Sequence, residues 1–123
     1  MLKRPTILAV NDQMQFREFI RSILKDKYEV ITAGGVEGAF KYMADYSVDL
    51  VLLDVKVARL DGISVLKEIK EKYPGTEVIL ITAYASLETI RKAFKLGAFG
   101  FLMKPFDIDR FIDTVDEALK MKH

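Results

Sequence analysis

Short runs of apolar residues alternate along this chain with longer stretches in which apolar residues recur every three or four positions. The short runs predict five strands. Three of these runs consist almost entirely of Val, Ile and Leu, which is typical of strands that are buried on both faces of a sheet. The predicted strands are Thr6–Val10, Tyr28–Ile31, Asp49–Leu53, Val78–Thr82 and Phe99–Met103.

The stretches between these strands have the periodicity of amphipathic helices. Asp61 and Ser86 are suitable N-caps for two of the helices, and Pro74-Gly75 is a strong stop signal after the first of these. A helix over about residues 35–45 is the weakest prediction, because glycines dilute it. Two further helices have apolar faces formed by Phe16, Phe19, Ile20, Ile23 and Leu24, and by Ile108, Phe111, Ile112, Val115 and Leu119.

The order strand–helix, repeated five times, predicts an α/β fold. It indicates a parallel sheet with helices on both faces and right-handed crossovers. At 123 residues the chain has the length of one domain, and no linker, repeat or low-complexity stretch divides it. There is no room for an effector domain, so we expect either a stand-alone domain or part of a longer protein.

Composition narrows the classes of function. The 19 basic and 18 acidic residues give a formal charge of +1, so nothing attracts the chain to DNA, RNA or an anionic membrane. Cysteine is absent, and the single histidine, His123, is the last residue. Disulfides and thiolate metal sites are therefore excluded. No apolar run approaches the length of a membrane span and no signal peptide opens the chain, so a cytoplasmic location is the default expectation.

Polar side chains follow four of the five predicted strands. In an open parallel sheet, ligands bind beyond the carboxyl ends of the strands, where the strand order reverses. The second strand runs into Thr32-Ala33-Gly34-Gly35, which is chemically quiet. The other four strands end at Asn11-Asp12, Asp54, Thr82-Ala83 and Lys104-Pro105.

Two carboxylates, an amide, a hydroxyl and an ammonium group are thus expected to meet at one edge of the sheet. One or two carboxylates with retained waters suit Mg²⁺. A carboxylate can attack phosphorus to form an aspartyl phosphate, and the other groups can bind phosphoryl oxygens. Each of these residues also has an ordinary structural interpretation when taken alone. Asp12 is typical of a turn, Thr82 of a strand, and Lys104 of the protein surface. Asp54 is more informative, because a carboxylate closing the run DLVLL is costly unless it is paired or solvated.

The chain resembles the receiver domains of bacterial two-component response regulators over essentially its whole length. The resemblance is carried by ILAVNDQ, DLVLLDVKVARLDG, VILITAY and GAFGFLMKPF. It implies a flavodoxin-like sheet of order 2-1-3-4-5 and one receiver domain over residues 1–123. It also implies a phosphorylation-dependent switch that assists its own phosphorylation and slow dephosphorylation and is not a turnover enzyme.

The resemblance also implies roles for individual residues. Asp54 would be the phosphoacceptor, and its donor would be a phosphohistidine on a sensor histidine kinase or a histidine phosphotransfer protein. Asp12 would bind Mg²⁺ together with Asp54 and the backbone carbonyl of Lys56. Asn11, which stands where the family usually has an acid, would offer its amide oxygen to a metal-bound water without adding charge.

A second group of residues would convert phosphorylation into a signal. Thr82 and Lys104 would hold the phosphoryl oxygens, and Phe101 matches the aromatic whose rotamer reports activation. Thr82 drawn toward the phosphate would vacate space for Phe101. The last helix–strand–helix unit would then present an altered face to an effector domain or partner. Phe99, Arg91, Lys95 and Arg110 lie on or next to this face, although Phe99 is equally compatible with core packing.

The lifetime of the phosphate would depend on bulky residues that flank the site. Lys56 and Tyr84 each lie two residues beyond a site residue and would crowd the water that hydrolyses the aspartyl phosphate, and Arg59 is a third candidate. Replacing Lys56 and Tyr84 with small residues is expected to speed loss of phosphate. The alternative interpretation is that both are ordinary surface residues.

Two other departures from the family pattern bear on function. Val57-Ala58-Arg59 replaces the usual Met-Pro-Gly, and Phe99-Gly100 replaces an acid pair that supports one mode of dimerisation, which leaves the oligomeric state open. Together with Asn11, the altered loop motivates an alternative function, that of a degenerate receiver acting as a phosphate-independent interaction module. A flavin-binding domain of the same topology is disfavoured, because Asn11-Asp12 has the wrong charge for a phosphate-binding loop.

Overall fold

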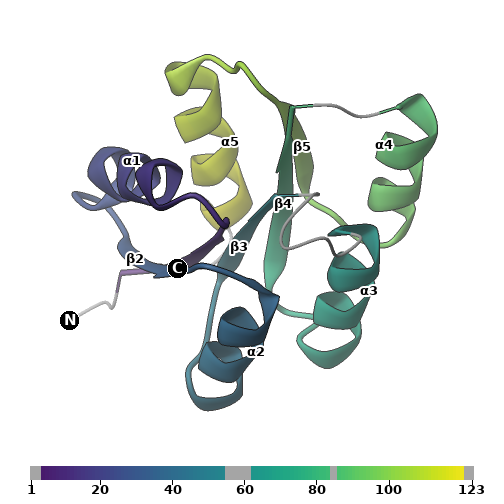
Figure 1. Cartoon of the computed structure of the whole chain (residues 1–123), viewed down its shortest axis with the longest axis horizontal. Coiled ribbons are helices and arrows are strands. Elements are labelled where there is room, and N and C mark those ends of the chain that lie inside the picture. Colours follow the sequence, from purple (N-terminus) through teal and green to yellow (C-terminus); the bar gives the residue numbers. More distant parts are fainter. Residues whose placement is uncertain (1–3, 55–61, 84–85, 121–123) are drawn as a thin grey trace.

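A computed structural model describes residues 4–54, 62–83 and 86–120, which form a five-stranded parallel sheet between two layers of helices (Figure 1). The strand order is β2-β1-β3-β4-β5, as the resemblance implied. The strands are β1 Thr6–Val10, β2 Glu29–Ala33, β3 Leu50–Asp54, β4 Glu77–Thr82 and β5 Gly100–Met103. The helices are α1 Met14–Leu24, α2 Val36–Asp45, α3 Gly62–Lys72, α4 Leu87–Lys95 and α5 Ile108–Leu119.

The central strands β1, β3 and β4 are apolar between their end residues because both of their faces are covered. In β1, Leu8 and Val10 pack into the cluster formed with α2, α3 and α4, whereas Ile7 and Ala9 pack into the cluster formed with α1 and α5. All four side chains are almost completely buried. Figure 1 shows the same division, with α1 and α5 on one side of the sheet and α2, α3 and α4 on the other.

Local signals in the sequence fix several helix boundaries. The hydroxyl of Ser86 accepts a hydrogen bond from the Thr89 N–H at 3.1 Å, which confirms the predicted N-cap of α4. Asp107 caps α5, because its Oδ1 accepts a hydrogen bond from the Asp109 N–H at 3.0 Å, so this helix starts after Asp107. The glycine-diluted prediction over residues 35–45 is confirmed by α2. The predicted cap Asp61 lies outside the described residues.

The second strand differs from its predicted bounds, Tyr28–Ile31. Tyr28 does not belong to β2, because its N–H donates to the Leu24 carbonyl at 3.0 Å and so closes the end of α1. At the other end the strand continues to Ala33, which pairs with Val10 in the register of β1 and β2. The bounds of β2 are therefore determined by its pairing with β1, and the apolar pattern of β2 alone does not predict them.

Several large apolar side chains on the predicted helix and strand faces are not buried. Phe19 on α1 and Ile108 on α5 are 38% and 44% exposed. Phe99, for which core packing was an open interpretation, is also 38% exposed and precedes β5. Within the described ranges, no helix has the length and apolar character needed to cross a bilayer.

Candidate functional site

Asp54 ends the central strand β3, at the carboxyl edge of the sheet. Its side chain is 17% exposed and carries an ion pair, with 3.2 Å between Oδ2 and the Lys104 Nζ. The same Oδ2 accepts a hydrogen bond from the Asn11 Nδ2 at 3.1 Å. These contacts give Asp54 the pairing that a carboxylate needs at the end of an apolar strand.

The orientation of the Asn11 amide is set by bonds on both of its sides. Asn11 is 2% exposed and directly follows β1. Its Oδ1 accepts from the Gln13 N–H at 2.8 Å, which leaves the NH₂ group directed at Asp54. Its backbone carbonyl accepts from the Arg17 Nη1 at 2.7 Å. Asn11 is therefore a neutral donor to Asp54 at the position where a carboxylate would repel it.

Asp12 is an exposed residue in the connection between β1 and α1. Val10 and Leu53 are register partners, so the residues that follow them bring Asp12 and Asp54 to the same edge of the sheet. Within the described part of the chain no three acidic or histidine side chains gather as a metal-binding group. Two carboxylates with several retained waters are nevertheless a donor set that suits Mg²⁺, so the residues present fit this ion. Lys56, whose carbonyl was predicted to assist, lies outside the described residues.

Thr82 and Lys104 reach the same edge from the two neighbouring strands. Thr82 ends β4, is fully buried and follows Ile81, the register partner of Asp54. The Lys104 N–H donates to the Thr82 carbonyl at 2.7 Å, which extends the pairing of β4 and β5 by one residue. The ammonium of Lys104 then reaches back to Asp54. Three adjacent strands thus bring together the three residues predicted to handle a phosphoryl group.

Two further residues contact this site, and the sequence prediction gave them no role there. The Lys104 Nζ lies 4.3 Å from the centroid of the Phe16 ring, in the geometry of a cation–π contact. Arg17 holds the backbone of Asn11. The apolar period assigned Phe16 to the buried face of its helix. The sequence feature that could have indicated this contact is the position of Phe16 in the first turn of α1, the helix that directly follows Asn11 and Asp12.

Phe101, in β5, lies beside a cavity next to α4. Its half-buried side chain lines a hollow of about 460 Å³ between α4, β5 and the start of α5. Ile90 and Phe94 line this hollow from α4, and Met103 lines it from β5. The predicted switch aromatic therefore borders a space that α4 partly covers.

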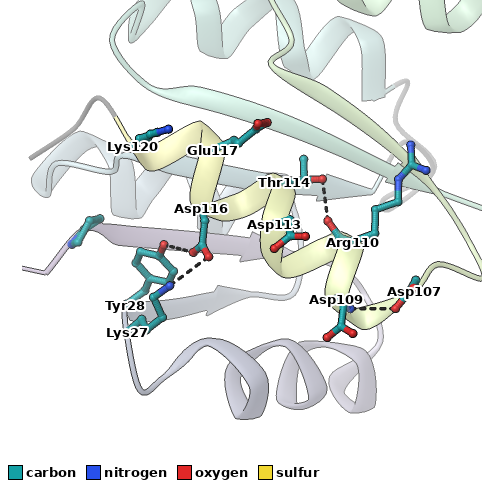
Figure 2. A pocket seen from close by; sticks show the side chains of 11 residues that line it. Lys27, Tyr28, Asp107, Asp109, Arg110, Asp113, Thr114, Asp116, Glu117 and Lys120 are labelled. Atoms are coloured by element: carbon teal, nitrogen blue, oxygen red, sulfur yellow. Dashed lines mark hydrogen bonds and ion pairs between the residues drawn. The ribbon is translucent and has the colours of Figure 1, made fainter.

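A larger groove of about 920 Å³ runs along α5 and shares no residue with the Asp54 site (Figure 2). At one end Asp116 accepts a hydrogen bond from the Tyr28 hydroxyl and pairs with Lys27, 3.0 Å away (Figure 2). Burial of the tyrosine, together with its bond to the Asp116 carboxylate and the charge of that group, raises the pKa of Tyr28 above its usual value. The contacts of Asp116 with Tyr28 and Lys27 join α5 to the connection between α1 and β2. The groove has no reactive group in common with the Asp54 site.

Three residues are predicted from the sequence to control the lifetime of a phosphate. Lys56, Arg59 and Tyr84 all lie outside the described residues. Their proposed roles remain predictions from the sequence.

Comparison with known proteins identifies relatives for this arrangement. The model of the response regulator receiver domain family matches residues 7–116. The transcriptional regulatory protein ZraR of Escherichia coli K12 is 38% identical over 118 residues, which are 95% of this chain and 27% of that protein. This chain therefore spans about a quarter of the length of the first curated relatives.

Two further relatives match over nearly their whole length. The sporulation initiation phosphotransferase F of Bacillus subtilis 168 is 37% identical over 117 residues, which are 94% of each chain. The solution structure of a beryllofluoride-activated NtrC4 receiver domain dimer is 33% identical and has a TM-score of 0.89, with 96% of this chain and 98% of that chain covered.

Proposed function

The chain belongs to the response regulator receiver domain family, signalling domains of two-component systems, and on that premise we propose that Asp54 accepts a phosphoryl group from a phosphohistidine. The donor belongs to a sensor histidine kinase or a histidine phosphotransfer protein. The observation that carries the proposal is the set of contacts to Asp54, whose Oδ2 is bound by the Lys104 ammonium and the Asn11 amide at the sheet edge.

The transfer is an in-line displacement at phosphorus. An oxygen of the Asp54 carboxylate forms the new P–O bond while the P–N bond to the donor imidazole breaks, and the imidazole leaves with the bonding electron pair and takes up a proton. Lys104 is within reach of the phosphoryl oxygens and offsets their charge, and Thr82 is the hydroxyl donor on the neighbouring strand. Magnesium bound by Asp12 and Asp54 would supply further positive charge to these oxygens.

In this proposal, phosphorylation changes the conformation of the last helix–strand–helix unit, which is α4, β5 and α5. Thr82 is drawn toward the phosphoryl group, and the space beside it becomes accessible to Phe101. The hollow lined by Phe101, Ile90 and Phe94 supports this step, because it provides space next to the Phe101 side chain and α4. The bias needed between the two states is only a few kcal/mol. An effector domain or partner that binds this face would read the change.

Titration with beryllofluoride, the phosphoryl mimic used to activate a related receiver domain, tests this function. Amide NMR spectra should shift at the ends of β1, β3 and β4 when Mg²⁺ and beryllofluoride are both present, and the shifts should extend through residues 86–106. Asp54→Asn should abolish them, and Asp45→Asn, an exposed acid at the end of α2, should not. Shifts confined to the Asp54 loop would contradict the switch, and their complete absence would contradict the site.

A further inference from the structure

Among the described residues, the ammonium of Lys104 contacts the charged Asp54 carboxylate and the uncharged ring of Phe16. Its Nζ lies 3.2 Å from the Asp54 Oδ2 and 4.3 Å from the centroid of the Phe16 ring. The distance to Asp54 is longer than the roughly 2.7–2.9 Å of a fully closed ammonium–carboxylate hydrogen bond. The Lys104 side chain is 27% exposed, so water weakens both contacts only in part. The Phe16 ring is therefore a second contact that supports the ammonium beside the Asp54 carboxylate.

Phe16 is itself held in place by other aromatic rings. Phe106 packs edge-on against it, with 6.4 Å between the ring centroids and 89° between the ring planes. Phe106 in turn packs at 5.2 Å against Phe111, which is fully buried in the core. A continuous row of rings thus connects the core of α5 to the ring beneath Lys104.

The backbone that carries Phe16 is fixed as well. Arg17, the next residue in α1, donates to the Asn11 carbonyl at 2.7 Å, and Asn11 donates to Asp54. The first turn of α1 is therefore tied to the same carboxylate that Lys104 binds. A ring held by its neighbours, on a helix start held by the site, can fix the position of the ammonium.

We propose that Phe16 is a positioning residue for phosphoryl transfer, in that its ring holds the Lys104 ammonium where it meets the incoming phosphoryl group. This inference rests on the proposed phosphorylation of Asp54 and adds a residue to that site. Without the ring, Lys104 is free to close fully on Asp54 or to turn into solvent. The first change makes the carboxylate a poorer nucleophile, and the second removes positive charge from the transferred oxygens. Both slow phosphorylation.

The test compares Phe16→Leu, which keeps an apolar side chain but removes the π face, with Phe16→Tyr, which keeps the face. Phe19→Leu is the matched control, because Phe19 is on the same helix, is 38% exposed and lies outside the row of rings that leads from Phe111 to Lys104. Phosphorylation is driven by acetyl phosphate, a small acyl phosphate. A small donor separates positioning of Lys104 from any effect of α1 on docking of a partner protein.

Two quantities are measured in each variant. The first is the NMR shift of the Lys104 ε-methylene, which a ring at this distance moves upfield. The second is the rate at which Asp54 gains the phosphoryl group. Phe16→Leu should lose the upfield shift and slow phosphorylation about three- to tenfold, the range expected for loss of a partly solvated cation–π contact. Phe16→Tyr and Phe19→Leu should keep both.

A Phe16→Leu variant with the parental rate, or with an unchanged Lys104 shift, would overturn the role of Phe16. A Tyr variant as slow as the Leu variant would also overturn it, since packing and not the π face would then be responsible. A parent protein that gains no phosphoryl group would instead overturn the proposed function. Amide spectra of each variant show whether the fold is retained.

Discussion

The Asn11 amide stands next to Asp54, the proposed phosphoacceptor, where the family usually has an acid, and its two hydrogen bonds set how it affects the Asp54 site. Its NH₂ group donates to Asp54, and its oxygen is already bound by the Gln13 N–H. The amide therefore donates to the Asp54 carboxylate and would add no charge to a metal site. The positive charges in contact with Asp54 and Asn11 are those of Lys104 and Arg17.

Asn11→Asp should tighten binding of Mg²⁺. The new carboxylate would stand about 3 Å from the Asp54 oxygen, so the metal-free protein would suffer like-charge repulsion that a divalent cation relieves. We expect an increase in affinity of about 10–100-fold, the usual range for a change in a group that supports a metal ligand. Titration calorimetry with Mg²⁺ measures the effect.

Ser22→Asp is the control for this substitution, because it adds the same charge to an exposed position farther along α1. Equal affinities for Mg²⁺ in the parent and in Asn11→Asp would show that position 11 does not contribute to the metal site.

At the scale of elements, the strands and helices were predictable where a local signal exists. The apolar runs of β1 and β3 and the Ser86 cap of α4 identified their elements. Tyr28 could not be placed in this way, because its apolar ring suits a strand while its backbone bond and its hydroxyl partner belong to α1 and α5. A residue whose hydrogen bonds go to two different elements has no periodic signature in either of them.

The bond between Tyr28 and Asp116 should make the stability of the fold depend on pH in the alkaline range. The folded state raises the pKa of Tyr28 above its ordinary 10.0, through burial first and Asp116 second. The contribution of Tyr28 to the free energy of unfolding is therefore complete below pH 10. It is lost as the pH rises above 10, because Tyr28 ionises in the unfolded chain before it ionises in the folded protein. The free energy of unfolding should fall by at most about 1.4 kcal/mol per pH unit from this one group.

Chemical denaturation between pH 8 and pH 11 tests this expectation, with Tyr28→Phe compared with the parent. Tyr28→Phe should be less stable at pH 8, by about 1–3 kcal/mol for a lost hydrogen bond to a charged group, and the difference should shrink above pH 10. Tyr46→Phe, at a tyrosine that is 61% exposed, is the control. A difference between Tyr28→Phe and the parent that stays constant across this range would contradict the account.

At the scale of the whole molecule, the parallel sheet assembles the site. Asp54, Thr82 and Lys104 are far apart in the sequence, and their meeting follows from the order of β3, β4 and β5. The sequence was sufficient to predict this meeting, because every strand of a parallel sheet points its carboxyl end at the same edge. It was insufficient for Phe16, whose ring meets Lys104 only through the packing of α1 against the start of α5.

The most direct test of the account is to locate the phosphoryl group after reaction with acetyl phosphate and Mg²⁺. We expect intact mass spectrometry to find one phosphoryl group per chain, peptide mapping after borohydride reduction to place it on Asp54, and Asp54→Asn to gain none. A normal rate of phosphorylation in Asp54→Asn would contradict the central claim. A folded parent protein that gains no phosphoryl group would contradict it as well, and would favour a phosphate-independent interaction module.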